Sequence, residues 1–239
     1  MEAFIGTSGW EYDDWRGKFY PDGLARAKWL EYYARTFSSV EVNSTFYRLP
    51  PASDVKVWYD NSPHDFVISL KASRYITHMK KLHEVSEPVN KFLNVAKELE
   101  EKMGIILFQL PQNFARDDKR LKTLLKILDK GYRYSIEFRH KSWFDNGVYD
   151  ILRAHETALC IYDLPGFSSP MVSTTDFTYV RFHGSTSLYS SSYSKQELKE
   201  WADHIRTLAG VRRVYIYFNN DAEGYSVENA KVMHGLFET

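Results

Sequence analysis

The sequence predicts an α/β fold, a (β/α)8 or TIM barrel that forms a single domain over residues 1–239. Two observations support this prediction. Eight short runs rich in apolar and β-branched residues alternate with segments of helical period. The 239 residues are 44% hydrophobic, as expected for a chain with one sizeable core, and barrels of this length are commonly one domain. A doubly wound sheet is the alternative architecture, because alternation alone does not separate the two.

The eight expected strands are short and consist mainly of Val, Ile, Phe, Tyr and Leu. Such residues are enriched in strands because they pack well on a pleated surface. The expected strands span residues 4–8, 39–43, 66–71, 105–110, 134–138, 159–163, 179–183 and 214–219. This count is the number of strands in a TIM barrel.

The helices between them are predicted from apolar residues that recur every three or four positions. Residues 121–128, 92–103 and 24–37 each carry such a stripe. Ser194 and Glu197 form a capping box, the pattern that begins a helix. Shorter helices are expected near 53–60, 147–156 and 225–237. After the sixth strand the segment LPGFSSPMVSTTDF is rich in Pro, Gly and Ser, so the sixth helix should be weak or missing.

Composition excludes several classes of protein. Lys+Arg and Asp+Glu both number 31, so the zero net charge gives no argument for a nucleic-acid or membrane partner. The only cysteine, Cys160, excludes an internal disulfide, fits a reducing compartment and should be buried. The N-terminus lacks a signal-peptide pattern, and no apolar run approaches the roughly 18 residues of a membrane span. A cytoplasmic protein is therefore expected.

Most of the expected strands end in polar side chains. In VEVN the alternation places Glu41 and Asn43 on one face, and later strands end in the same way. The strand-end polar residues are Glu41, Asn43, Ser69, Lys71, Gln109, Glu137, Arg139, Asp163, Arg181, His183, Tyr217 and Asn219. Because the C-terminal ends of all strands in a parallel barrel meet at one face, these side chains should converge on one mouth.

Two interpretations of this polar mouth stay open. Buried charges are costly unless paired, so the strand-end charges could be an internal ion-pair network that only closes the barrel. Their convergence on the face where TIM barrels carry active sites favours a ligand site. On that interpretation, Arg181→Ala should abolish ligand binding and leave the fold stable.

Seven longer stretches are also distinctive. In order they read GTSGWEYDDWRGKFYP, YYARTFSSVEVNSTFYRLP, SLKASRYITHMKKL, ILFQLPQNF, SIEFRHKSWF, YVRFHG and YFNNDAEGYSVENA. Together they resemble the motifs of the YecE-like family, known as domain of unknown function 72, over practically the whole chain. The resemblance implies a TIM barrel and supplies no reaction. Two departures are Gln112, where the family tends to have proline, and the Tyr225–Ser226 pair, which replaces a smaller, more apolar pair.

The residue types in the mouth suit an anionic ligand, because planar guanidinium groups match phosphate and carboxylate. The expected anion clamps are Lys71, Arg139 and Arg181. The candidate catalytic acid and base groups are Glu41, Glu137 and His183. The other predicted ligand-binding residues are Asn43, Gln109, Asp163, Asn219, Asn220, Trp10 and Tyr47. The basic segment SRYITHMKKLHEVS is a candidate lid over the third strand.

Three functions are compatible with such a mouth. The first is a hydrolase or lyase acting on a phosphorylated or nucleic-acid-like substrate, with proton transfer by a carboxylate or His183. One version of it includes a divalent metal held by Glu41, Glu137, Asp163 and His183. The second is a glycoside hydrolase that uses Glu41 and Glu137 as its carboxylate pair. The third is a module that binds a nucleic acid or a phosphorylated metabolite without catalysis.

Overall fold

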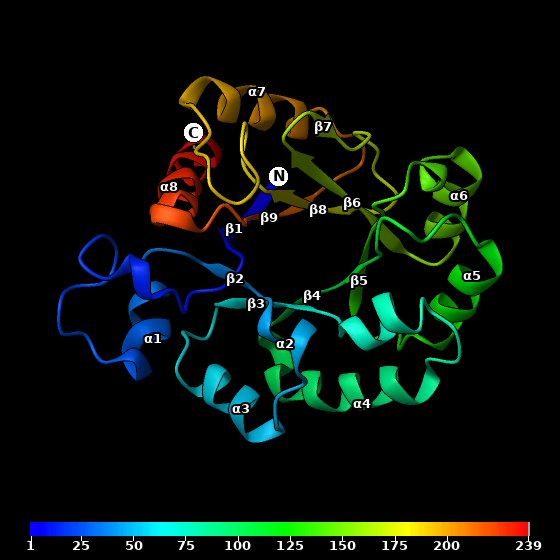
Figure 1. The fold of residues 1–239 in the computed structure, drawn as a ribbon, viewed down its shortest axis with the longest axis horizontal. Helices are drawn as coiled ribbons and strands as arrows, with labels where there is room; N and C mark the ends of the chain where they lie inside the picture. Colours follow the sequence, from blue (N-terminus) through cyan, green and yellow to red (C-terminus); the bar gives the residue numbers. More distant parts are fainter. Residues whose placement is uncertain (239) are drawn as a thin grey trace.

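The computed structural model describes residues 1–238 and confirms a nearly closed barrel of parallel strands surrounded by helices (Figure 1). All eight expected strands are present. In hydrogen-bonded order they are β1 (Glu2–Thr7), β9 (Arg213–Phe218), β8 (Phe177–Phe182), β6 (Thr157–Leu164), β5 (Arg133–Glu137), β4 (Met103–Gln109), β3 (Val67–Lys71) and β2 (Ser39–Val42). An additional two-residue strand, β7 (Phe167–Ser168), pairs antiparallel with the end of β6.

The predicted helices are present, with two differences in length, and one short helix, at Ser44–Tyr47, was not predicted. They are α1 (Trp29–Tyr33), α2 (Ser44–Tyr47), α3 (Ala52–Asp60), α4 (Ser86–Ala96), α5 (Asp118–Ile127), α6 (Asn146–Ala154), α7 (Lys195–Arg206) and α8 (Tyr225–Phe237). The capping box of Ser194 and Glu197 is confirmed at the start of α7. Within the described residues no helix lies between β6 and β8, which confirms the missing sixth helix. None of the helices in residues 1–238 is long and apolar enough to cross a membrane.

The two differences have local causes. The stripe over 24–37 yields only α1, preceded by a 3-10 turn at Arg26–Lys28. The stripe over 92–103 belongs to α4, which ends at Ala96 and continues as a 3-10 segment, Lys97–Lys102. Glu100 there has φ +48°, a left-handed conformation that ends helical geometry, and Met103 already begins β4.

The barrel closes at a seam between β1 and β2. These strands share one isolated bridge, between Ser8 and Glu41, instead of a ladder. A Cβ added at Gly6 would lie 1.9 Å from the Ser39 carbonyl oxygen, so the seam requires glycine at this position. The Tyr33 hydroxyl bridges the strands: it accepts the Thr7 N–H (2.8 Å) and donates to the Ser39 carbonyl (3.1 Å).

We expect Tyr33→Phe to lower the free energy of unfolding by about 1–3 kcal/mol, because it leaves the buried Thr7 N–H without its acceptor. Urea unfolding measures this change. Tyr32→Phe is the matched control, since the Tyr32 hydroxyl makes no hydrogen bond within residues 1–238, and it should change stability by less than about 0.5 kcal/mol. Equal losses in both variants would contradict the seam role of Tyr33.

The inside of the barrel is an apolar floor beneath a charged layer. The floor consists of Ile105, Leu107, Ala158, Cys160, Phe177, Tyr179, Tyr215 and Tyr217. Cys160 is fully buried there, as predicted. The charged layer above it consists of Glu41, Lys71, Glu137 and Arg181, all at the C-terminal ends of their strands. A second, larger apolar cluster lies between the sheet and the helices. The fold therefore places the predicted charges directly above a cluster of buried apolar side chains.

Candidate active site at the barrel mouth

The centre of the charged layer is one arginine between two carboxylates. Arg181 donates through Nη2 to Glu41 Oε1 and through Nη1 to Glu137 Oε2, both at 2.8 Å. All three side chains have an exposed fraction of 0%. Arg181 crosses the barrel from β8 to reach β2 and β5. The internal ion-pair network considered from the sequence therefore exists, and Arg181 is its hub.

Each carboxylate has further partners. Glu41 accepts hydrogen bonds from Ser8 Oγ and Tyr179 Oη, both at 2.6 Å. Glu137 also accepts from Arg139 Nε. Burial alone would raise the pKa of Glu137, but Arg139 and Arg181 hold that pKa well below its usual range. Glu137 therefore remains ionised at physiological pH, which suits a base or an electrostatic role and does not suit a general acid.

His183 is neutral in this environment. Arg139 Nη2 lies 2.9 Å from His183 Nε2, and because guanidinium only donates, Nε2 must accept and Nδ1 carries the proton. Burial and the two neighbouring arginines lower the pKa of His183 well below 6.5. The expectation that His183 moves protons near neutral pH therefore does not fit its surroundings. Its buried Nδ1 has no hydrogen-bond partner among the described residues.

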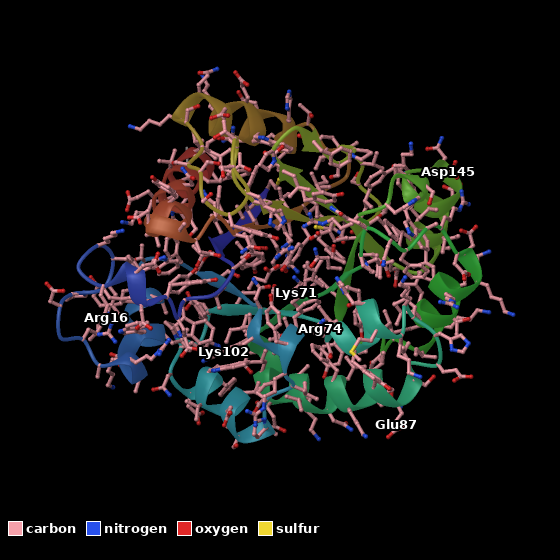
Figure 2. The ribbon with its side chains drawn as sticks, in the orientation of Figure 1. Arg16, Lys71, Arg74, Glu87, Lys102 and Asp145 are labelled. Carbon is pink, nitrogen blue, oxygen red and sulfur yellow. The ribbon has the colours of Figure 1, made fainter. Side chains whose placement is uncertain are left out.

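Lys71, at the end of β3, is the one cation of the charged layer without a carboxylate partner in residues 1–238. Its side chain is near the centre of the barrel (Figure 2), with Nζ 4.3 Å from the centroid of the Phe46 ring. The residue is 9% exposed. Burial and Arg181 lower the pKa of Lys71 from 10.5 to about 7, although Glu137 and Glu41 act in the opposite direction.

A cleft of about 720 Å³ opens beside this layer, over the ends of β4, β5 and β6. Its lining includes Gln109, Arg139, His78, Leu188 and Tyr189. The Arg139 side chain is 7% exposed, and its Nη1 makes no hydrogen bond within residues 1–238. Gln109 and Arg139 are the predicted site residues that line this cleft, whereas Glu41, Glu137 and Arg181 lie buried beneath the mouth.

The segment expected to be a lid forms a π-helical turn, Tyr75–Met79, followed by three left-handed residues, Lys81, Leu82 and Glu84. This turn brings His78 to the cleft, where burial and Lys71 lower the His78 pKa to about 4. Tyr189, on the opposite side, has φ +62°. Strained backbone and π-turns concentrate at functional sites, so the conformation of these loops supports a role for the cleft.

Several predicted ligand-binding residues do not reach this mouth. Asp163 accepts from Ser168 Oγ (2.5 Å) and Tyr193 Oη (2.8 Å), because β7 folds back against the end of β6. Asn220 is buried and donates to Ser191 O and Asn229 Oδ1, both at 2.9 Å, which ties the loop after β9 to α8.

The two predicted aromatic contacts also fall outside the cleft. Trp10 is buried and packs edge-on against Trp58 of α3, with ring centroids 5.8 Å apart. Tyr47 is 72% exposed. Asn43 Nδ2 lies 3.5 Å from the Ser8 carbonyl oxygen, and Asn219 accepts from Arg181 Nη2 at 3.3 Å. Asn219 therefore supports the charged layer, whereas Asn43 contacts the backbone beside it and its buried Oδ1 has no hydrogen-bond partner among residues 1–238.

The proposed metal ligands are not grouped. Within residues 1–238 no three His, Cys, Asp or Glu side chains lie together in a way that would hold a metal ion. Asp163 faces Ser168 and Tyr193, and Glu41 and Glu137 are occupied by arginine. The four-residue metal version therefore does not fit these side chains.

Asp221 was not predicted as a site residue, although it directly follows Asn219 and Asn220, which were predicted. Burial raises the pKa of Asp221 to about 7, with Asn219 and Tyr12 acting in the opposite direction. Asp221 Oδ2 accepts from Asn219 Nδ2 at 2.9 Å, and Oδ1 has no partner within the described chain. The sequence indicates Asp221 only as the third consecutive polar residue after a strand, in YFNND.

Comparisons with known proteins agree with this fold. A family model described as "Protein of unknown function DUF72" matches residues 4–239. UPF0759 protein YunF of Bacillus subtilis is 25% identical over 98% of this chain and 94% of its own length. UPF0759 protein YecE of Escherichia coli K12 is 31% identical over 60% of this chain and 51% of its own. The crystal structure of a DUF72 family protein from Thermotoga maritima covers the whole of both chains at 29% identity, with a TM-score of 0.91.

Proposed function

Since the chain belongs to the DUF72 family, whose description assigns no reaction, we propose from the site itself that it is an enzyme acting on a small phosphorylated or otherwise anionic substrate in the cleft. The observation that carries this proposal is the charge arrangement. Glu41 and Glu137 both pair with arginine, while Lys71 Nζ and Arg139 Nη1 make no hydrogen bond and no salt bridge in residues 1–238.

The residues divide into two roles. Arg181 is a positioning residue, because it is fully buried and fixes both carboxylates. Arg139 lines the cleft and would hold the anionic group through Nη1. Glu137 and His183 hold the Arg139 guanidinium from behind, so the clamp is oriented before the substrate arrives. Preorganised positive charge of this kind stabilises negative charge that develops in a transition state.

Arg139→Gln should weaken binding of a phosphorylated ligand by about 10- to 100-fold, since a hydrogen bond to a charged group contributes about 1.5–3 kcal/mol. Calorimetric titration with glycerol 3-phosphate and with a nucleoside monophosphate measures the effect. Arg153→Gln is the control, because Arg153 lies on α6 and does not line the cleft. Equal affinity in both variants, or binding of neutral sugars alone, would contradict an anion clamp at Arg139.

A nucleic-acid-like substrate is the second candidate, because exposed apolar side chains gather in the loops that follow β2, β3, β6 and β8. These side chains are Tyr47, Tyr75, Met79, Phe167, Leu188 and Tyr189. Aromatic faces beside exposed Arg48 and Arg74 suit the stacked bases and backbone of a single strand. A fluorescent single-stranded oligonucleotide, titrated at two salt concentrations against wild type and Tyr75→Ala, separates this candidate from a small metabolite.

A further inference from the structure

We propose that Lys71 is a nucleophilic amine that forms a Schiff base with an aldehyde or ketone whose phosphate or carboxylate group is held by Arg139. This deepens the proposed function and rests on it: the substrate class becomes a small anionic carbonyl compound. Three sets of observations support the inference, namely how Lys71 is held, which partners it lacks, and what surrounds it.

The backbone at Lys71 is rigid. Lys71 pairs with Leu107 of β4, and its carbonyl oxygen accepts from Thr45 Oγ1 at 2.7 Å. The Phe46 ring lies beside the ammonium group, 4.3 Å away. Thr45 and Phe46 both belong to α2, so one short helix supports the lysine from its backbone to its tip. The amine is therefore held in the charged layer beneath the cleft before any substrate arrives.

A second buried lysine shows what a structural lysine looks like in this protein. Lys102 is 5% exposed, and its Nζ donates to Tyr59 O (2.6 Å), Ser62 O (2.7 Å) and Ser62 Oγ (3.2 Å). It lies outside the barrel beside α3 (Figure 2). Lys71 is buried to a similar degree, and within residues 1–238 it makes no hydrogen bond and no salt bridge. Its Nζ instead contacts the face of the Phe46 ring, so no hydrogen bond of the described chain has to be broken before the amine reacts.

Burial favours the neutral form of Lys71, and the charges around it act in both directions: Arg181 and Arg139 lower its pKa, whereas Glu137 and Glu41 raise it. The titratable and charged groups in electrostatic reach are Glu41 from β2, His78 from the π-turn, Glu137 and Arg139 from the end of β5, and Arg181 and His183 from the end of β8. The carboxylates among them are already occupied by arginine. With its pKa lowered to about 7, a large fraction of Lys71 is the reactive free amine at neutral pH.

The reaction needs no reagent beyond a proton from solvent. The Nζ lone pair attacks the carbonyl carbon, a C–N bond forms as the carbonyl π bond breaks, and one amine proton moves to the oxygen to give a neutral carbinolamine. A proton from solvent then adds to the hydroxyl group, the C–O bond breaks, water leaves, and a protonated imine remains. That iminium withdraws electrons from the adjacent carbon, which labilises a neighbouring C–H or C–C bond. Such chemistry is typical of a lyase or isomerase step on an anionic carbonyl substrate.

Pyridoxal 5′-phosphate, an aldehyde that carries a phosphate, is a suitable probe. The full chain is incubated with it, reduced with borohydride, and mapped by peptide mass spectrometry. We expect the label on Lys71 and none on Lys102, at least 10-fold slower labelling in the presence of excess inorganic phosphate, and loss of the main label in Lys71→Met. The rate should rise with a midpoint near pH 7, whereas surface lysines react with a midpoint near their ordinary pKa of about 10.4.

The outcomes separate this inference from the proposed function. The assignment of Lys71 as the nucleophile would be overturned if the label spread over surface lysines at the same rate in the wild type and in Lys71→Met. If glycerol 3-phosphate still binds through Arg139 in that case, the proposal of an anionic substrate still holds and only the role of Lys71 is refuted. Conversely, specific labelling of Lys71 that neither phosphate nor Arg139→Gln slows would support the amine and refute the anion clamp.

Discussion

Arg181→Ala is expected to lower the free energy of unfolding by about 3–5 kcal/mol at neutral pH, because removing one partner of a buried ion pair leaves the other charges uncompensated. Arg181 contacts both Glu41 and Glu137, and none of the three is exposed. Glu137 keeps Arg139, but Glu41 retains only the hydroxyl groups of Ser8 and Tyr179. This reverses the expectation from the sequence, in which the same substitution left the fold stable.

The pH dependence provides a second test. In the wild type the lowered pKa of Glu137 contributes stability above its ordinary pKa of 4.5, and this contribution is lost as pH falls through the lower folded-state value. Without Arg181 that lowering is weaker, and protonation relieves the uncompensated carboxylates. Urea unfolding should therefore show a larger deficit at pH 7 than at pH 3, because the contribution of Glu137 in the wild type is complete at pH 7 and falls below pH 4.5.

A compensating variant serves as the control. Arg181→Met combined with Glu41→Gln removes one positive and one negative charge and leaves Glu137 paired with Arg139, so it should recover most of the stability that Arg181→Met alone loses. A deficit that is equal at pH 7 and pH 3, and that the double variant does not relieve, would show that lost packing around Arg181 matters more than its charge.

The fold was predictable because two regularities in the sequence are strong. Strand alternation of period two determines which side chains share a face, and a parallel barrel brings all strand ends to one mouth. Glu41, Glu137 and Arg181 are far apart in the sequence, yet these rules alone place them in one layer, and the structure confirms that they meet.

The partners within that layer were not predictable, because they depend on how each side chain turns. Arg139 lies two residues beyond Glu137 and folds back onto it. Asp163 has comparable depth on β6, but the β7 hairpin directs it to Ser168. Asp221 lies after β9 in a loop without periodicity, so its burial and raised pKa could not be deduced from spacing. The sequence therefore does not determine which strand-end charges are paired, and only the structure shows it.

Lys71→Met should stabilise the protein at neutral and acidic pH, which is the opposite of what most core substitutions do. Burial disfavours the charged amine, so the pKa of Lys71 falls from 10.5 to about 7 on folding. The unfolded chain then binds the proton more tightly than the folded chain, and the difference corresponds to at most about 5 kcal/mol.

The sign of the effect follows from this linkage. The cost of the buried lysine is fully present below about pH 7, decreases as pH rises, and disappears near pH 10.5. Urea unfolding from pH 6 to pH 10 should therefore show a gain in Lys71→Met that is largest at the acidic end and shrinks steadily. A gain that is independent of pH would mean that methionine simply packs better against Phe46.

Lys102→Met is the matched control and should behave in the opposite way. It would leave the Ser62 carbonyl oxygen without its donor and remove one of several donors to the Tyr59 carbonyl oxygen, so it should destabilise the protein. The two buried lysines would then differ in kind: Lys102 contributes to the fold, and Lys71 lowers its stability. A residue that lowers stability at the mouth of a barrel, on a strand end aimed at the site, is best explained by a function that requires its amine.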